Sequence, residues 1–348
     1  MSEQAPQDLD PPSVDSSPVP KVSVAMITYN HEKFIGQAIE SVLMQETDFP
    51  IELVIGEDCS TDNTRQIVKH YAEARPDIVR PLLPEKNLGP GQNLMAVLAE
   101  CRGEYIAILE GDDFWTDLLK LKKQVGLLDS NPEYSMCGTA ARDVIVDPDG
   151  GEQKAGLFPH RNTKSLYNLE DVLAAYPFRT LTFLFRNELV KFPEWLSRVT
   201  NCDICILILS AEKGPIAYLD DVTGAYRIHD GGIWRGSTPL DRYEATRIRR
   251  EVLSKHFSGR HAKILRRRDF QFLEELCLEG GDSSQLVEVK KIFRESLNRF
   301  VFSMPISYLK LGVSVYGGHK LVLVWNRFTK RLAIRTRIRR LLERHKGI

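Results

Sequence analysis

Residues 105–115 read YIAILEGDDFW, an apolar run that ends abruptly in carboxylates. The run Tyr105–Leu109 predicts a buried strand, so Glu110, Asp112 and Asp113 would crowd the point where that strand ends. Carboxylates this close repel one another, and a hard divalent cation such as Mg2+ or Mn2+ is their natural partner. The alternative is a solvated acidic turn in which an Asp caps the following helix.

Predicted strands and helices alternate through the region that leads to this stretch. The expected strands are Val22–Ile27, Glu52–Ile55, Val79–Leu83 and Tyr105–Leu109, and the expected helices are Phe34–Met44, Asn63–Ala74 and Gln92–Cys101. This order predicts an α/β fold, Rossmann-like, with a mostly parallel sheet sandwiched by helices. Ligands bind such sheets beyond the carboxyl ends of the strands. Polar clusters at Thr28-Tyr29-Asn30, Glu57-Asp58 and Glu110–Asp113 follow three of these strands, which favours one shared site.

Composition is that of an ordinary globular protein. The chain has 348 residues, of which 43% are hydrophobic and 27% charged, enough for one large core or two modest ones. Residues 1–20 predict a disordered leader without the apolar core of a signal peptide, and no apolar run has the roughly 18–20 residues that a bilayer span needs. Six scattered cysteines, including the pair Cys202 and Cys205, predict reduced packing thiols. We therefore expect a cytoplasmic location.

The motifs together resemble an inverting family 2 glycosyltransferase of the GT-A fold. The resemblance is carried by VSVAMITYN (22–30), GEDCSTDNT (56–64), NLGPGQN (87–93) and EGDDFW (110–115). It covers residues 21–236 and implies a donor half at 21–115 and an acceptor half at 116–236. It also implies transfer from a UDP- or dTDP-sugar to a hydroxyl of a saccharide or lipid-linked acceptor, in polysaccharide or glycolipid biosynthesis.

The resemblance implies a donor site at the carboxyl ends of the strands. Thr28 and Tyr29 would line the nucleobase pocket, and Asp58 would accept a hydrogen bond from the imide N–H of uracil or thymine. The alternative for Asp58 is an Asx turn. Further donor-site candidates are Asn30, Glu57, Lys86 and Asn87.

By the same resemblance, EGDDFW is the metal-binding motif. Asp113 would bind Mg2+ or Mn2+ directly, Asp112 would face the ribose or sugar or share the ion, and Glu110 would support them. In YRIHDGGIW (226–234), His229 would approach the metal or diphosphate from a mobile loop, and Arg227 would contact a phosphate. The alternative for His229 is an ordinary hydrogen-bonded structural histidine.

Inversion requires one base that activates the acceptor hydroxyl. Asp203 in NCDICILILSAEKG (201–214) is the candidate by resemblance, and its alternative is an ordinary helix N-cap. Residues 178–183, FRTLTF, alternate like a strand whose threonines would face the acceptor or pack in the sheet.

No family motif follows residue 236, so residues 237–348 predict a mainly helical, basic extension. Helices are expected at Arg247–Lys255 and Lys263–Leu278. Residues 301–348 hold eleven Lys and Arg against the single acid Glu343, and apolar residues from Arg327 onward recur at roughly helical spacing. A basic amphipathic helix suits an anionic membrane surface, which would place the protein on the inner face of the plasma membrane. The alternative is a solvated or self-associating helix.

Other classes of protein fit less well. A response-regulator receiver also gathers acids at strand ends, but it needs only about 120 residues. A Rossmann dehydrogenase would carry GxGxxG where this chain has TYNHEKF (28–34). The neutral net charge and the missing motifs argue against nucleic-acid binding. A non-catalytic scaffold that binds a sugar nucleotide with the same fold remains the alternative to an enzyme.

Overall fold

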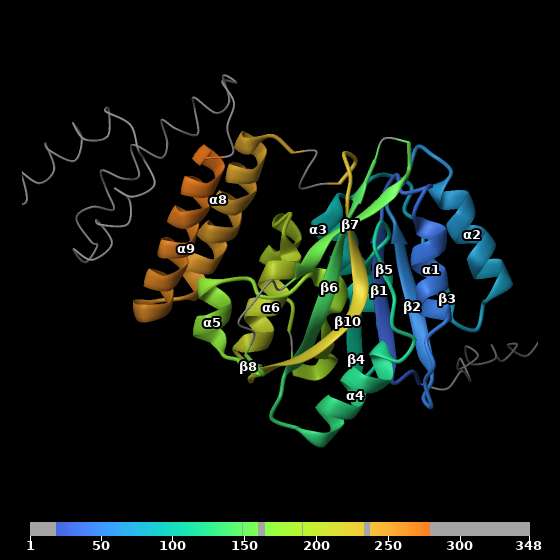
Figure 1. The fold of residues 1–348 in the computed structure, drawn as a ribbon, viewed down its shortest axis with the longest axis horizontal. Helices are drawn as coiled ribbons and strands as arrows, with labels where there is room; N and C mark the ends of the chain where they lie inside the picture. The colour runs from blue at the N-terminus through green and yellow to red at the C-terminus, as the bar shows by residue number, and fades with distance from the viewer. Residues whose placement is uncertain (1–18, 148, 159–163, 190, 233–236, 279–348) are drawn as a thin grey trace, which may run out of the picture. The chain divides into compact units, whose positions relative to one another are not determined.

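The computed structural model describes residues 19–147, 149–158, 164–189, 191–232 and 237–278 (Figure 1). Its strands are β1 (Val22–Thr28), β2 (Ile51–Glu57), β3 (Val79–Leu82), β4 (Tyr105–Glu110), β5 (Phe114–Trp115), β6 (Met136–Val146), β7 (Glu152–Phe158), β8 (Leu166–Tyr167), β9 (Leu184–Arg186) and β10 (Ile216–Ile228). Its helices are α1 (Ile35–Leu43), α2 (Thr64–Ala74), α3 (Pro90–Glu100), α4 (Lys120–Ser130), α5 (Leu169–Ala174), α6 (Cys202–Ala211), α8 (Pro239–His256) and α9 (Gly259–Leu278), with short 3-10 turns η1 (Thr180–Thr182), η2 (Asn187–Leu189) and η3 (Glu194–Arg198).

The ten strands of the described ranges belong to one sheet, whose main path runs β3-β2-β1-β4-β9-β6-β10-β5. Strands β1 to β4 pair in parallel, as do β6 and β10, whereas the short β9 lies antiparallel between β4 and β6. The two parallel groups therefore point the same way. The predicted α/β fold with a mostly parallel sheet covered by helices is confirmed.

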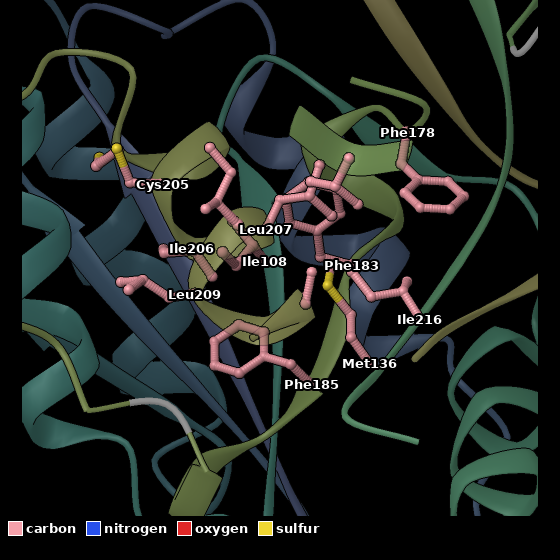
Figure 2. Close-up of a cluster of buried hydrophobic side chains, with 14 of the residues drawn as sticks. Ile108, Met136, Phe178, Phe183, Phe185, Cys205, Ile206, Leu207, Leu209 and Ile216 are labelled. Carbon is pink, nitrogen blue, oxygen red and sulfur yellow. The ribbon is translucent and has the colours of Figure 1, made fainter. Parts of the chain in front are cut away.

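Each face of the sheet has its own apolar core. Helices α1, α2 and α4 cover one face, packing residues such as Ile39, Val68 and Val125 against it. Helices α3 and α6 cover the other face, and α5, α8 and α9 contribute to the same cluster. Figure 2 shows how α6 inserts Ile206, Leu207 and Leu209 among apolar side chains of the strands. Because apolar residues run almost without a break along α6, that helix is buried nearly all round.

Residues 178–183 do not form the predicted strand. Thr180–Thr182 form η1, and strand β9 begins only at Leu184. The Thr182 hydroxyl donates to the Arg179 carbonyl at 2.7 Å, a local bond that competes with a sheet ladder. Since Thr182 is also fully buried, its side chain does not face an acceptor.

Helices α8 and α9 contain the two helices that were predicted beyond residue 236, and they lie side by side in Figure 1. Leu253, Phe257 and Leu265 share the apolar cluster of α5 and α6. Residues 1–18, most of the predicted leader, and residues 279–348, which include the basic segment 301–348, lie outside the described residues. Among the helices described, none combines the length and the apolar character that crossing a membrane requires. The division of the chain at residue 237 stays a prediction.

One lysine, Lys120, is fully buried beside the Trp115 ring. Lys120 begins α4, its Nζ donates to Gln124 Oε1 at 2.6 Å, and the ammonium lies 4.3 Å from the centre of the Trp115 ring. Burial lowers the pKa of Lys120 to about 7. In the unfolded chain a lysine titrates near pH 10.4, roughly, so between these two values unfolding takes up one proton at this site.

We therefore expect Lys120 to make the free energy of unfolding rise with pH, by up to about 1.4 kcal/mol per pH unit between pH 7 and 10. Urea unfolding at pH 7.5 and 9.5 should show the wild type gaining stability relative to Lys120→Met. Lys122→Met, on the same helix but half-exposed, serves as the control and should follow the wild type. Parallel changes in wild type and Lys120→Met would contradict the expectation.

Candidate active site

The carboxyl ends of the parallel strands bring the predicted polar clusters to one edge of the sheet. Register pairs Thr28 of β1 with Glu57 of β2, and Ile27 with Glu110 of β4. His229 follows β10, which points the same way. Segments from the beginning, the middle and the end of the glycosyltransferase-like region therefore meet here.

The acidic turn after β4 is not a solvated helix cap. Helix α4 begins only at Lys120, with Leu119 at its N-cap position, and Asp113 is 1% exposed. Gly111 packs against β1, where a β-carbon would lie 2.6 Å from Thr28 Oγ1, so only glycine fits. The turn is thus pressed against the end of β1, and the alternative of a solvated turn is wrong.

Two histidines flank the Asp112 carboxylate. His229 Nε2 lies 3.1 Å from Asp112 Oδ2, and His31 Nε2 lies 3.6 Å from the same oxygen. The His229 ring also contacts the Phe34 ring, at 4.8 Å between centroids. His229 is 7% exposed, and it follows directly from strand β10. His31 was not predicted as a site residue, although it continues the polar run Thr28-Tyr29-Asn30.

The three carboxylates repel one another when they are ionised. Burial, with the negative charges of Asp203 and Asp112, raises the pKa of Glu110 to about 8. Burial and the same kind of repulsion hold the pKa of Asp113 well above its usual range. Burial would also raise the pKa of Asp112, but the nearby His31 and His229 more than offset it, so that pKa is lowered. Glu110 Oε2 is buried without a hydrogen-bond partner. A proton or a cation would relieve this cluster.

The donor atoms suit a divalent ion whose remaining coordination positions are filled by a substrate and water. Carboxylate oxygens with one imidazole fit Mg2+ or Mn2+, Mn2+ accepting nitrogen more readily. Across the described ranges, no three His, Cys, Asp or Glu side chains are arranged to hold an ion by themselves. The protein would therefore supply one or two ligands, and phosphate oxygens and water the rest.

Arg227 clamps the acidic turn instead of facing solvent. Its backbone N–H donates to Asp113 Oδ1 at 2.8 Å, and its Nη1 donates to the Asp112 carbonyl at 2.9 Å. Its Nε binds Glu152 at 2.7 Å and its Nη2 binds Gln37. The side chain is 1% exposed. Because each guanidinium nitrogen already donates to the protein, the structure gives Arg227 a positioning contact with the turn where a phosphate contact was predicted.

Asp113 was the predicted direct metal ligand. Its Oδ1 accepts the hydrogen bond from the Arg227 backbone N–H. Asp112 differs because its side chain is 19% exposed and its Oδ2 faces His229. Between the two aspartates, the geometry thus favours Asp112 as the residue that meets a ligand.

Asp203 lies in the first turn of α6 and is not the cap, since Asn201 occupies the N-cap position. Its Oδ2 accepts a hydrogen bond of 2.8 Å from the hydroxyl of Thr180. Its charge contributes to the raised pKa of Glu110. The chain therefore brings the predicted base beside the carboxylate cluster.

Asp58 reaches across to the loop before α3. Its Oδ1 accepts from the N–H of Leu88 at 2.7 Å and its Oδ2 from the N–H of Gly89 at 2.9 Å. Asn87 Nδ2 donates to the Asp58 carbonyl at 2.9 Å. Because the hydrogen-bond donors to the Asp58 carboxylate come from residues about thirty positions away along the chain, this carboxylate does not form a local Asx turn. Each carboxylate oxygen has a second lone pair, and the residue is 2% exposed.

Two other donor-site candidates have structural partners. Glu57 is fully buried and binds the Ser60 N–H at 2.7 Å as well as Arg65, so its carboxylate stabilises the loop after β2. Asn30 adopts a φ of 56° and accepts from the Thr61 N–H at 2.9 Å, which joins the loops after β1 and β2. In contrast, Tyr29 is 43% exposed and Lys86 is exposed, so both side chains are accessible.

Residues 23–189 match the glycosyl transferase family 2. This segment is a family 2 glycosyltransferase domain. Its acidic turn, Thr180 and the strand ends β1, β2 and β4 all fall within the match, whereas Asp203, Arg227 and His229 follow it.

Relatives and solved structures agree with this domain. An uncharacterised Mycobacterium tuberculosis protein is 35% identical over 216 residues, 62% of this chain and 61% of that protein, so the match spans about three fifths of its length. The crystal structure of Staphylococcus aureus TarS in complex with UDP-GlcNAc has a TM-score of 0.58 at 24% identity, over 82% of each chain. A Pyrobaculum calidifontis mannosyltransferase in complex with GDP-Man and Mn2+ has a TM-score of 0.52 at 17% identity, over 95% of this chain and 90% of that one. These likenesses show the GT-A fold.

The contacts of the Arg227 guanidinium lead to a prediction about stability. In Arg227→Lys, one ammonium cannot reach Glu152, Gln37 and the Asp112 carbonyl together, so we expect a loss of roughly 2–4 kcal/mol in the free energy of unfolding. Guanidinium unfolding measures it, with the exposed Arg75→Lys as control. A variant with unchanged stability but weaker nucleotide binding would instead identify Arg227 as a phosphate contact.

Proposed function

We propose that this chain is a metal-dependent inverting glycosyltransferase that moves a sugar from a UDP- or dTDP-sugar to an acceptor hydroxyl. The observation that carries the proposal is the meeting of Asp112 and His229, 3.1 Å apart, beside a buried and partly unsatisfied carboxylate cluster. This meeting occurs at the carboxyl edge of the sheet, where α/β folds bind ligands.

The donor would lie along the ends of β1 and β2. The exposed Tyr29 would line the nucleobase pocket with Thr28, and Asp58 would accept from the base with a free lone pair. Lys86, beside the loop that Asp58 organises, is accessible to the donor. The complexes of TarS with UDP-GlcNAc and of the Pyrobaculum enzyme with GDP-Man support a nucleotide-sugar donor for this fold.

The ion would be held by Asp112 and His229. When bound, Mg2+ or Mn2+ supplies Lewis-acid stabilisation of the diphosphate leaving group. Glu110 and Asp113, whose pKa values are raised, lie in the same turn, and Arg227 fixes the turn that carries all three acids. We assign direct binding to Asp112, because Asp113 is occupied with the Arg227 backbone.

Asp203 would act as the base. Its Oδ2 is oriented by the Thr180 hydroxyl, and Oδ1 is left to accept the proton of the acceptor hydroxyl. The acceptor oxygen then bonds to the anomeric carbon from one face. The bond from that carbon to the diphosphate oxygen breaks on the other face, and its electron pair leaves with the nucleotide. A saccharide or lipid-linked acceptor, and a peripheral membrane position through the basic segment 301–348, belong to the same proposal.

Nucleotide binding tests the donor and the ion together. We expect UDP or dTDP to stabilise the protein only with Mn2+, by about 2.7 kcal/mol at 100 times the dissociation constant. Thermal unfolding with UDP, dTDP, GDP and ADP, each with Mn2+ or with EDTA, measures this. A shift with GDP alone would overturn the choice of base, and equal shifts in EDTA would overturn the metal requirement.

Asp203→Asn tests the chemistry. Because a general base contributes roughly 10²- to 10⁴-fold, we expect UDP release from UDP-GlcNAc, with water as acceptor, to fall by about that factor. Binding of UDP should be unchanged. Asp220→Asn, an exposed acid on β10, is the control. Equal rates in Asp203→Asn and wild type would remove Asp203 from the mechanism, and tight UDP binding with no turnover in wild type would favour the non-catalytic scaffold.

A further inference from the structure

His31 is held rigidly beside the Asp112 carboxylate. Its backbone N–H donates to Thr64 Oγ1 at 2.8 Å, and its carbonyl accepts from the N–H groups of Phe34 and Ile35 at 2.9 Å. These bonds tie the residue to the first turns of α1 and α2. The side chain is 14% exposed. The imidazole therefore has a defined place in the turn after β1.

Both ring nitrogens of His31 face polar groups. Nδ1 lies 3.2 Å from Thr28 Oγ1, and Nε2 lies 3.6 Å from Asp112 Oδ2. When the Thr28 hydroxyl donates to Nδ1, the N–H of a neutral ring must be on Nε2, directed at Asp112. The distance of 3.6 Å is longer than a hydrogen bond, so this N–H acts as an oriented dipole on the carboxylate.

His31 and His229 approach the same oxygen of Asp112 from loops at the two ends of the domain. Their rings meet edge to face with centroids 6.3 Å apart. His229 lies nearer to the carboxylate, at 3.1 Å, and comes from the end of β10. Both imidazoles face Asp112 Oδ2. Because rotation of the carboxylate would move this oxygen away from both rings, we infer that the two rings together restrict that rotation.

We propose that His31 is a positioning residue for the divalent ion. His31 holds Asp112 in the orientation in which Asp112 and His229 together bind the ion. The inference rests on the proposed function, since it takes Asp112 and His229 as the protein's ligands. His31 acts through Asp112 and does not bind the ion itself, in keeping with the lack of any three-residue metal cluster within the described part of the chain. Groups that orient a metal ligand usually contribute about 10- to 100-fold to affinity.

The two nitrogens can be tested separately. Gln places an amide N–H near the position of Nε2, whereas Asn places its amide near Nδ1, and Phe keeps the ring but has no nitrogen. Mn2+ affinity is measured from the electron paramagnetic resonance signal of free Mn2+, at saturating UDP. We expect affinity to fall about 10- to 100-fold in His31→Asn and His31→Phe, and to stay within about 3-fold of wild type in His31→Gln. His70→Gln, an exposed histidine on α2, is the control.

The outcomes separate this inference from the proposed function. Wild-type protein that binds no Mn2+ with UDP would overturn the metal site and the role of His31 with it. Wild-type protein that binds Mn2+, with equal affinity in His31→Phe, would overturn the role of His31 alone. Equal losses in His31→Gln and His31→Phe would also overturn it, because packing of the turn would then be the cause. If His31→Asn does not fold, the Mn2+ affinities of His31→Phe and His31→Gln decide whether the Nε2 position of His31 is needed.

Discussion

The mutual repulsion of Glu110, Asp112 and Asp113 is the constraint on which the rest of the site depends. A parallel sheet directs the end of β4 to the edge where β1, β2 and β10 also end, so the three acids cannot disperse into solvent. Two of them have a raised pKa because burial and neighbouring charge both disfavour ionisation. The protein around them supplies positive charge and hydrogen-bond donors in specific places.

These compensating groups contact different parts of the acidic turn. Arg227 holds the turn from within the protein, with its guanidinium 4.2 Å from the centre of the Phe114 ring and 5.1 Å from that of Phe34. His229 and His31 face Asp112, whose side chain is 19% exposed. The pKa values of Glu110 and Asp113 are raised, whereas that of Asp112 is lowered beside the two imidazoles, so the negative charge of the turn concentrates on Asp112. In the proposed function, this is the charge that the cation would meet.

Much of the fold could be predicted from residues alone. Strand β4 and helix α2 were expected within a residue of their observed bounds, because long apolar periods and Ser-Thr-Asp starts are local signals. The stretch 178–183 was predicted wrongly, since its alternation resembles a strand while a threonine hydroxyl bonds to its own backbone and forms η1. The motifs predicted roles for Asp58 and Asp203, which stay predictions, and their hydrogen-bond partners, the Leu88 and Gly89 amides and the Thr180 hydroxyl, left no local signal.

The sequence by itself determined the alternation of strands and helices, and with it the edge where the polar clusters had to meet. The tertiary structure decided that His229 and His31 flank Asp112 and that Arg227 points into the acidic turn. The physical reason is separation along the chain: Arg227 meets Gln37 across 190 residues, and His229 meets Asp112 across 117. Local patterns report the hydrogen bonds and burial of neighbouring residues, whereas the charge balance of this site arises only when distant segments pack together.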